Sequence, residues 1–173
     1  KEHHPNAQVT IFEKSKKILS KVKVSGGGRC NVTNGCTDVN ELCEAYPRGG
    51  KRLKKAFYEF NTLDTMRWFE ERGVPLVTQE DNCVFPKSQS SQSIIDCLVQ
   101  ATKLHHIKID LGKGVTAIEP IENGLKLSFN KNIIPPQIFE KVIIATGGSP
   151  KRSGLEWLEA LGHKIENPVP SLF

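Results

Sequence analysis

The sequence predicts a mixed α/β fold in which a parallel β-sheet is combined with an antiparallel β crossover. Two short apolar runs, residues 9–12 and 142–145, indicate strands that are covered on both faces, as in a parallel sheet. Between them, helical periodicity alternates with hairpin signals, and residues 114–130 carry the alternating pattern of two antiparallel strands. The chain has 173 residues, 38% of them apolar, and is therefore long enough to bury one ordinary core.

The first predicted strand lies in "AQVTIFEK", ends on Glu13 and leads into a basic, glycine-rich loop. Two helices are predicted next, one in "GKRLKKAFYEF" and one in "NTLDTMRWFEERG". In the second helix Asn61 or Thr62 can supply the N-cap, and the glycine and proline of "RGVP" end the helix.

A hairpin, a helix and a second hairpin are predicted in the middle of the chain. The segment "VTQEDNCVF" predicts a small hairpin that turns at Asp81 and Asn82. The helix follows in "SSQSIIDCLVQATKLH", and its inward face is expected to hold Ile94, Ile95, Leu98 and Ala101. The second hairpin, in "GVTAIEPIENGLKLSFN", is expected to turn at residues 122–124.

Near the end of the chain, the apolar run of "FEKVIIATGG" breaks directly into Thr146, Gly147 and Gly148. Ligands of parallel sheets bind just beyond the carboxyl ends of the strands, so we expect these three residues to lie at a binding site. A last helix is predicted in "SGLEWLEALGH", closed by Gly162.

Positive charge is concentrated in the first third of the chain. Residues 1–60 hold 12 Lys and Arg against 6 Asp and Glu, whereas residues 61–173 hold 12 against 13. A local excess of this kind suits an anionic ligand such as a pyrophosphate, or a nucleic-acid backbone. For Lys14, Lys16 and Lys17 taken alone, a solvated lysine-rich face is an equally good interpretation.

The cysteines and histidines do not form a recognisable metal site. The five cysteines are odd in number and lack the paired C-x2-C spacing of zinc sites, so we interpret them as free thiols of a cytoplasmic protein. The five histidines have no third donor at metal-ligand spacing. No apolar run approaches the roughly 20 residues needed to cross a bilayer, so no membrane partner is expected.

The stretch "SGGGRCNVTN" is the most specific motif of the chain. Together with Glu13 at the end of a strand, the antiparallel crossover and "VIIATGG", it resembles the HI0933-like family of flavoproteins, which are bacterial NAD(P)/FAD-dependent oxidoreductases. The resemblance covers the chain almost from end to end. It implies a FAD-binding Rossmann-like domain, with NAD(P)H as the reductant and an unidentified small molecule as the substrate.

The resemblance also implies that residues 1–173 are a partial FAD-binding domain, incomplete at both ends. In such a domain an acid about 20 residues beyond a G-x-G-x-x-G turn binds a ribose hydroxyl, and Glu13 fits that acid. Because only twelve residues precede Glu13, we expect the first strand and its phosphate loop upstream of Lys1. A smaller insert domain is expected soon after Phe173.

Carried over residue by residue, the resemblance implies a set of cofactor-binding residues and no metal ligand. Glu13, with Lys14 beside it, is assigned to the adenosine ribose, and the loop of residues 25–31 to the flavin and its pyrophosphate. Glycine suits such a loop because it allows close backbone approach and φ > 0. The full set is Glu13, Lys14, Ser25, Gly26, Gly27, Gly28, Arg29, Asn31, Val115, Thr146, Gly147 and Gly148. No catalytic acid or base is named.

Two alternative classes of protein stay open at this point. The segment "YPRGGKRLKK" combines an RGG triplet with a basic cluster, as in proteins that contact nucleic-acid phosphates or in flavoproteins that modify RNA. It has one RGG and no stacking platform of several aromatics, so we rank a nucleic-acid partner below a small molecule. A flavin-binding regulator without turnover is the third class, and NAD(P)H oxidation by a yellow protein separates the enzyme from it.

Cys30 lies inside the glycine motif and needs separate consideration. A redox role beside a flavin requires a second cysteine close by, usually as C-x-x-C or C-x4-C, whereas the next cysteine is Cys36. We therefore favour a packing role for Cys30.

Overall fold

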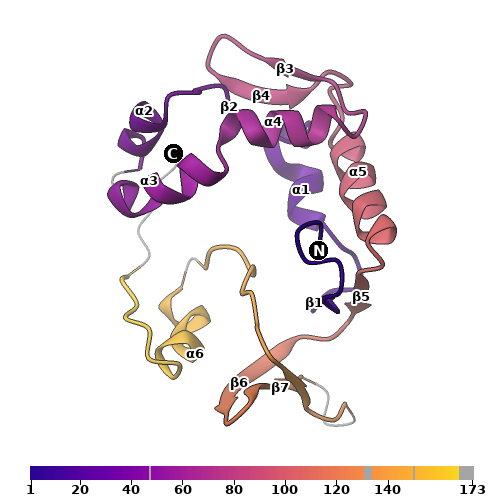
Figure 1. Ribbon diagram of the computed structural model, residues 1–173, viewed down its shortest axis with the longest axis vertical. Helices are drawn as coiled ribbons and strands as arrows, with labels where there is room; N and C mark the ends of the chain where they lie inside the picture. Colours follow the sequence, from indigo (N-terminus) through magenta and orange to yellow (C-terminus); the bar gives the residue numbers. More distant parts are fainter. Residues whose placement is uncertain (47, 131–133, 150, 168–173) are drawn as a thin grey trace. The chain divides into compact units, whose positions relative to one another are not determined.

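The computed structural model describes residues 1–46, 48–130, 134–149 and 151–167, and its chain divides into two compact units (Figure 1). The first unit comprises Lys1–Val9 and Lys17–Lys108, and the second comprises Thr10–Lys16 and Ile109–Phe173. Strands and helices are mixed in the chain, as predicted. No helix of the described residues is long and apolar enough to span a bilayer.

The first unit contains a small antiparallel sheet in the order β2-β4-β3. Its strands are β2 (Thr33–Asn34), β3 (Leu76–Thr78) and β4 (Cys83–Pro86). The predicted turn between β3 and β4 is confirmed, with Asn82 at φ 62° and the Asp81 Oδ1 accepting a hydrogen bond of 2.9 Å from the Cys83 amide.

Helix α4 (Thr62–Glu70) begins where the sequence predicts. The Asn61 side chain accepts hydrogen bonds from the Leu63 and Asp64 amides, and the Asp64 carboxylate accepts one of 2.9 Å from the Asn61 amide. This reciprocal capping box satisfies amides that the first turn would otherwise leave unpaired. Of the two predicted caps, Asn61 is therefore the one used.

Helix α5 (Ser91–Leu104) supplies one wall of the core of the first unit. Ile94 is buried as predicted, while the other three predicted inward residues are half-buried. The buried core cluster consists of Cys30, Phe69, Val74, Ile94 and Cys97. The apolar periodicity predicts the correct inward face of α5. It does not indicate that Cys97 is buried there, because cysteine is a small residue that packs as a hydrophobe.

Helices α2 (Val39–Glu44) and α3 (Gly50–Glu59) form a helical hairpin, as the ribbons show (Figure 1). Their packing is close at Gly50, where an added Cβ would lie 2.2 Å from the Cys43 carbonyl oxygen. Asp38 caps α2 by accepting hydrogen bonds from the Asn40 and Glu41 amides.

The first unit also holds α1 (Ser20–Val24), which runs into the single 3-10 turn η1 (Ser25–Gly28). The sequence predicts a loop over this region, so the short helix is a correction. A residue outside the helix holds it in place: the buried Ser91 hydroxyl donates a 2.9 Å hydrogen bond to the Lys23 carbonyl. Such a long-range contact leaves no periodic signal in the sequence.

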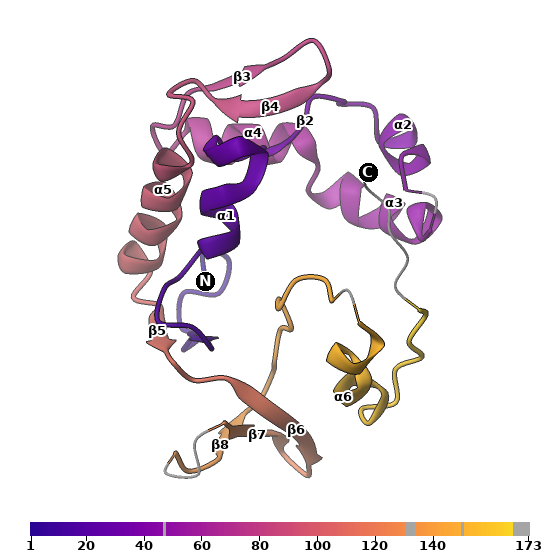
Figure 2. The same ribbon diagram turned by 180° about the vertical axis from the view of Figure 1, so that it is seen from behind.

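In the second unit, β1 (Thr10–Glu13) and β5 (Lys108–Leu111) form the two-stranded parallel sheet. An antiparallel sheet follows in the order β6-β7-β8, seen from behind in Figure 2. Its strands are β6 (Val115–Ile121), β7 (Gly124–Phe129) and β8 (Gln137–Phe139). Phe12 packs against Phe129 and Phe139 with ring centroids 5.0 and 5.7 Å apart, so aromatic contacts form the core of this unit.

The predicted hairpin of residues 114–130 is confirmed, with Ile121 paired to Gly124 across the turn. The register shifts between Val115 and Ala117, which marks a β-bulge at the start of β6. The sequence does not predict β8, because three residues with one exposed isoleucine give no clear alternation.

Two predictions for the C-terminal part need correction. Residues 142–145 form no strand, and Ile143 is 93% exposed, because no described strand accepts their backbone hydrogen bonds. The last predicted helix is instead two short pieces, η2 (Arg152–Gly154) and the single turn α6 (Glu156–Glu159), and the Trp157 indole of α6 donates a 3.1 Å hydrogen bond to the Gly154 carbonyl of η2.

Candidate cofactor-binding site

Three consecutive glycines give the loop of the first unit its shape. Gly26, Gly27 and Gly28 have φ values of 54°, 67° and 85°, all in the left-handed region. Residues with a Cβ pay a steric penalty in this region, whereas glycine does not. The run of three glycines in the motif is thus required by the backbone path itself.

The loop is closed by its own backbone. The Arg29 amide donates to the Gly26 carbonyl at 3.3 Å, and the Cys30 amide donates to the Ser25 carbonyl at 3.0 Å. A Cβ added at Gly26 would lie 2.8 Å from both the Asn31 nitrogen and a Phe85 ring carbon. The amides of Arg29 and Cys30 are therefore used within the loop and are not directed at a ligand.

Gly27 differs from Gly26 because it faces open space. A Cβ added at Gly27 would meet no heavy atom within 4 Å. An open pocket of about 360 Å³ lies beside the same loop, and its lining includes Lys21, Ser25, Asn31, Phe69, Ile94 and Leu98. The loop thus offers a close backbone surface that a ligand could cover, next to a partly apolar hollow.

Arg29 is held over the loop by three contacts. Its guanidinium lies 4.0 Å from the centroid of the Phe85 ring, within the range of cation–π attraction. The Nε donates to the Gly26 carbonyl at 3.2 Å, and Nη1 donates to the Gln89 Oε1 at 3.4 Å. Phe85 and Gln89 were not identified from the sequence, because they reach the loop from β4 and from the turn before α5.

Cys30 follows Arg29 at φ 64° with only 6% of its surface exposed. Its neighbours in the core cluster are Phe69, Val74, Ile94 and Cys97. This burial agrees with the predicted packing role. All five cysteines are free, so none is positioned as its disulfide partner.

A second thiol lies beside the loop. The Asn31 Nδ2 is 3.4 Å from the Cys83 Sγ. The pKa of Cys83 is raised above its ordinary value, chiefly by its hydrogen bond to the Asp81 carboxylate and then by burial. The Cys83 thiol therefore stays protonated at neutral pH and is a poor nucleophile.

In the second unit, Glu13 ends β1 and is built into the turn that follows. Its Oε1 accepts a 2.7 Å hydrogen bond from the Ser15 amide, and its carbonyl accepts one of 3.0 Å from the Lys113 amide. The carboxylate is half-buried and has a fixed orientation. An acid at the end of a strand binds a ribose hydroxyl in many Rossmann-type domains, and the assignment of Glu13 to this role stays a prediction.

The predicted residues Lys14 and Val115 lie near Glu13. A Cβ added at Gly114 would be 3.2 Å from the Lys14 Cβ, and Val115 follows directly as the first residue of β6. Gly114 is fixed by Asn130, whose amide donates to the Gly114 carbonyl at 2.9 Å. The second unit thus brings Glu13, Lys14 and Val115 together.

Thr146, Gly147 and Gly148 lie in a stretch without regular secondary structure. Gly147 has a φ of 77°, and a Cβ added at Gly148 would meet no heavy atom within 4 Å. Among the residues that the structure describes, no hydrogen bond links these three to Glu13 or Lys14. Their prediction as cofactor-binding residues stays a prediction.

Each unit, taken by itself, has one feature that suits a dinucleotide cofactor. In the first unit the left-handed glycines leave open space at Gly27 that a side chain would fill. In the second unit the Glu13 carboxylate is oriented at the end of a parallel strand. Among the described residues, no group of three His, Cys, Asp or Glu side chains could hold a metal ion.

A parallel strand pair and an acid that ends one of its strands are features of dinucleotide-binding domains of the Rossmann type. The chain matches the HI0933-like protein Rossmann domain over residues 1–169, so it belongs to the HI0933-like family. This confirms both the family and the fold class that the sequence predicts.

Curated relatives carry two kinds of name. The chain is 25% identical over 173 residues to the 3-dehydro-bile acid delta(4,6)-reductase of Clostridium scindens, covering 96% of this chain and 41% of that protein. It is 28% identical to the ribosomal RNA dihydrouridine synthase of Haemophilus influenzae, covering 81% of this chain and 34% of that protein. The Escherichia coli ribosomal RNA dihydrouridine synthase is 27% identical, with 82% and 34% covered. The chain therefore spans less than half the length of these relatives.

Proposed function

We propose that this chain belongs to a FAD-dependent oxidoreductase and that FAD lies against the glycine loop. The observation that carries the proposal is the open space at Gly27, in the middle of three left-handed glycines. A backbone in this conformation without a side chain in front of it is what a flat ring or a pyrophosphate needs for close approach. Membership of the HI0933-like Rossmann family supports the same cofactor.

In this proposal Glu13 accepts a hydrogen bond from a ribose hydroxyl of FAD. Its Oε1 is already fixed by the Ser15 amide, so the carboxylate needs little reorganisation to receive a second donor. Lys14 and the backbone of Val115 lie next to it and would contact the adenosine half. Thr146, Gly147 and Gly148 are proposed as a further backbone contact with the cofactor.

The residues of the loop would hold the rest of the cofactor. Contacts with Phe85 and Gln89 hold the Arg29 guanidinium beside the glycines. A cation is therefore present where the anionic groups of the cofactor would lie. Bound FAD would supply hydride chemistry, with NADH or NADPH as the proposed electron source. The chain's own residues bind the cofactor, orient it and exclude water from one face.

The relatives' names suggest the class of bond that is reduced. A delta(4,6)-reductase of a 3-dehydro steroid acts on carbon–carbon double bonds conjugated with a ketone. Dihydrouridine is uridine reduced across a ring double bond that is conjugated with a carbonyl. We infer that this protein reduces a carbon–carbon double bond conjugated with a carbonyl, either in a small molecule, as the sequence favours, or in a uridine of RNA.

The absorbance spectrum of the purified whole protein tests the cofactor. We expect a bound oxidised flavin whose visible bands bleach under anaerobic addition of NADH or NADPH. A protein that stays colourless after incubation with FAD would show that the glycine loop binds something else. Flavin that is retained but not reduced by either nucleotide would refute NAD(P)H as the electron source and favour a regulator without turnover.

A further inference from the structure

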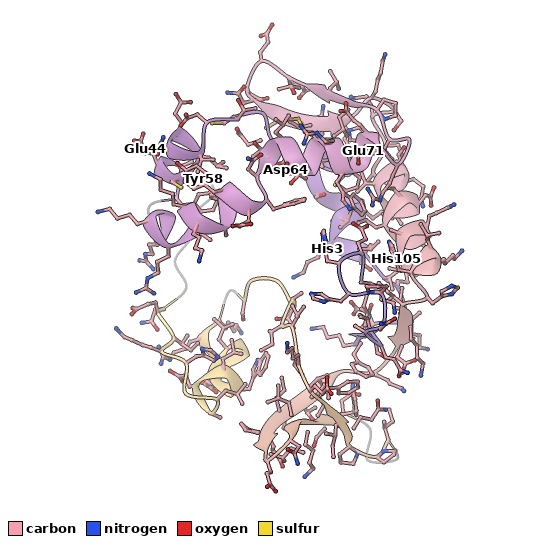
Figure 3. The ribbon with its side chains drawn as sticks, viewed as in Figure 1. His3, Glu44, Tyr58, Asp64, Glu71 and His105 are labelled. Atoms are coloured by element: carbon pink, nitrogen blue, oxygen red, sulfur yellow. The ribbon has the colours of Figure 1, made fainter. Side chains whose placement is uncertain are left out.

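Helix α3 presents a strip of positive charge that the flavin site does not use. Its cations are exposed, and Figure 3 shows nitrogen-tipped side chains projecting from this helix. On its other side, Leu53 and Phe57 are half-buried and Gly50 is buried against α2. We call the exposed cations the α3 basic face: Arg48, Lys51, Arg52, Lys54 and Lys55.

The stability of α3 does not explain this arrangement. The first turn of α3 contains no acid, and its N-cap is Gly49, which has no capping side chain. Cations near a helix N-terminus interact unfavourably with the helix dipole, and like charges four residues apart, such as Lys51 and Lys55, repel each other. A local sequence choice that opposes folding is expected at a functional surface.

The charges of the α3 basic face are not neutralised by ion pairs. Within residues 1–46, 48–130, 134–149 and 151–167, none of the described salt bridges includes any of its five cations. The charge of Lys54 acts on Asp38, but the pKa of Asp38 is lowered first by the Glu41 and Asn40 amides and only last by Lys54. A polyanion would therefore meet cations that are free to pair with it.

Exposed aromatic side chains accompany these cations. Tyr46 is 43% exposed, Tyr58 is 63% exposed and Phe60, directly after the helix, is 54% exposed. Tyr58 is labelled on α3 in Figure 3. From the sequence alone a nucleic-acid partner ranks below a small molecule, because "YPRGGKRLKK" contains no stacking platform of several aromatics. The structure, however, exposes three aromatic rings on or directly next to the hairpin that carries the cations. Such rings can stack with unpaired bases.

The same charges could attract an anionic membrane, but the geometry of α3 disfavours this partner. A helix that lies on a bilayer buries an apolar face in it. Leu53 and Phe57 of α3 are half-buried, and Tyr46 packs on Phe57 with ring centroids 5.6 Å apart. The exposed residues of α3 are mostly charged, which suits phosphate binding better than insertion into a bilayer.

We propose that the α3 basic face binds the phosphate backbone of RNA, with Tyr58 stacking on an unpaired base. This inference rests on the proposed reductase function only for the purpose of RNA binding, which is to present a uridine for reduction. Binding itself requires no flavin, so the two proposals can fail separately.

The test uses the whole protein and a fluorescein-labelled RNA hairpin with a uridine-rich loop, with binding followed by anisotropy over a series of salt concentrations. The variant changes four cations to glutamine, which keeps good helix propensity. We expect the Kd for the RNA hairpin to rise at least about tenfold. The steepness of log K against log salt should decrease by about 3, because each lost phosphate contact lowers this steepness by about 0.7 to 0.9. The substitutions are K51Q, R52Q, K54Q and K55Q.

A matched control removes four exposed lysines elsewhere and should change Kd by less than about threefold. If the control weakens binding as much as the α3 variant, only net charge matters and the proposal is wrong. A charge-retaining variant, K51R/K54R/K55R, should bind like the parent; loss of binding here would mean that folding, not charge, was altered, and would also overturn the proposal. The control substitutions are K87Q, K103Q, K141Q and K164Q.

Two further arms identify the partner. Tyr58→Ala should weaken binding of the hairpin about fivefold or more while Tyr58→Phe does not, because stacking needs the ring and not the hydroxyl. If the four-glutamine variant instead loses binding to phosphatidylglycerol vesicles and keeps its RNA affinity, the surface is a membrane contact and the proposal is overturned. The amount of bound flavin is measured in every variant. If the four-glutamine variant keeps both its flavin and its RNA affinity, the RNA-binding inference is refuted and the proposed flavin site is not affected.

Discussion

Gly27→Ala provides the sharpest test of the cofactor surface, because the structure offers a matched control at Gly73. Both glycines have positive φ, 67° and 79°, and at both an added Cβ would meet nothing within 4 Å. Left-handed strain costs about 1 to 2 kcal/mol, and the lower entropy of the unfolded chain returns up to about 1 kcal/mol. Each variant should therefore lose about 1 kcal/mol of unfolding free energy.

The two variants should differ in flavin affinity. Gly73 lies at the end of α4, away from the loop in sequence, so Gly73→Ala should bind FAD as the parent does. At Gly27 the methyl group would occupy the space proposed for the cofactor. Overpacking by a methyl costs about 1 to 3 kcal/mol, which corresponds to a loss of about five- to hundredfold in FAD affinity.

The assay pairs thermal unfolding with flavin titration by fluorescence quenching. Tm should fall by about 2 to 4 °C in both variants, since a domain of this size loses that much per kcal/mol. Equal FAD affinity in the two variants would refute the placement of the cofactor at Gly27. Gly26→Ala is expected to destabilise the protein more than either, because its Cβ would lie 2.8 Å from Asn31 and Phe85.

Three further outcomes are expected. Glu13→Ala should weaken FAD binding by about 1 to 3 kcal/mol, since it leaves ribose hydroxyls without an acceptor; unchanged affinity in a flavin titration would rule the assignment out. Arg29→Lys should cost about 1 kcal/mol of FAD affinity, because the charge stays while the forked donor geometry is lost, and the same titration measures it. Burial would raise the pKa of Glu2, but the charge of Arg72 and hydrogen bonds from Arg72, His105 and Trp68 hold it below its ordinary value. A lowered folded-state pKa means that Glu2 stabilises the fold above its unfolded pKa and loses this effect as pH falls through the folded pKa. The difference in Tm between the parent and Glu2→Gln should therefore vanish on acidification below the ordinary range of a glutamate; a difference that persists there would contradict the role of the Glu2 charge.

The elements that could be predicted are those with a local physical cause. The hairpin at Asn82 depends on a turn residue that tolerates positive φ, and α4 depends on the capping pair Asn61 and Asp64. The elements that could not be predicted depend on distant partners. Helix α1 is tied by Ser91, and β8 exists because β7 pairs with it.

Residues 142–145, for which the sequence predicts a strand that does not form, also show that distant partners decide the outcome. Four apolar residues in a row satisfy every local criterion for a buried strand, yet Ile143 is 93% exposed. A strand needs neighbours that accept its backbone hydrogen bonds, and no described strand does so. An apolar sequence alone is thus not sufficient for a parallel strand, because the pairing decides whether the strand forms.

The motif "SGGGRCNVTN" combines both kinds of requirement, and the structure separates them. Gly26 and Cys30 serve the fold: Gly26 has no room for a side chain, and Cys30 fills the core. Gly27 and Arg29 are not explained in this way, because the fold would accept a side chain's volume at Gly27, and Arg29 is held at the surface of the loop by Phe85. A motif that is highly specific as a whole therefore does not make each of its residues a ligand contact. At Gly27 the fold needs a positive φ but leaves the space of a side chain open, so Gly27 is the position at which a cofactor contact can be tested first.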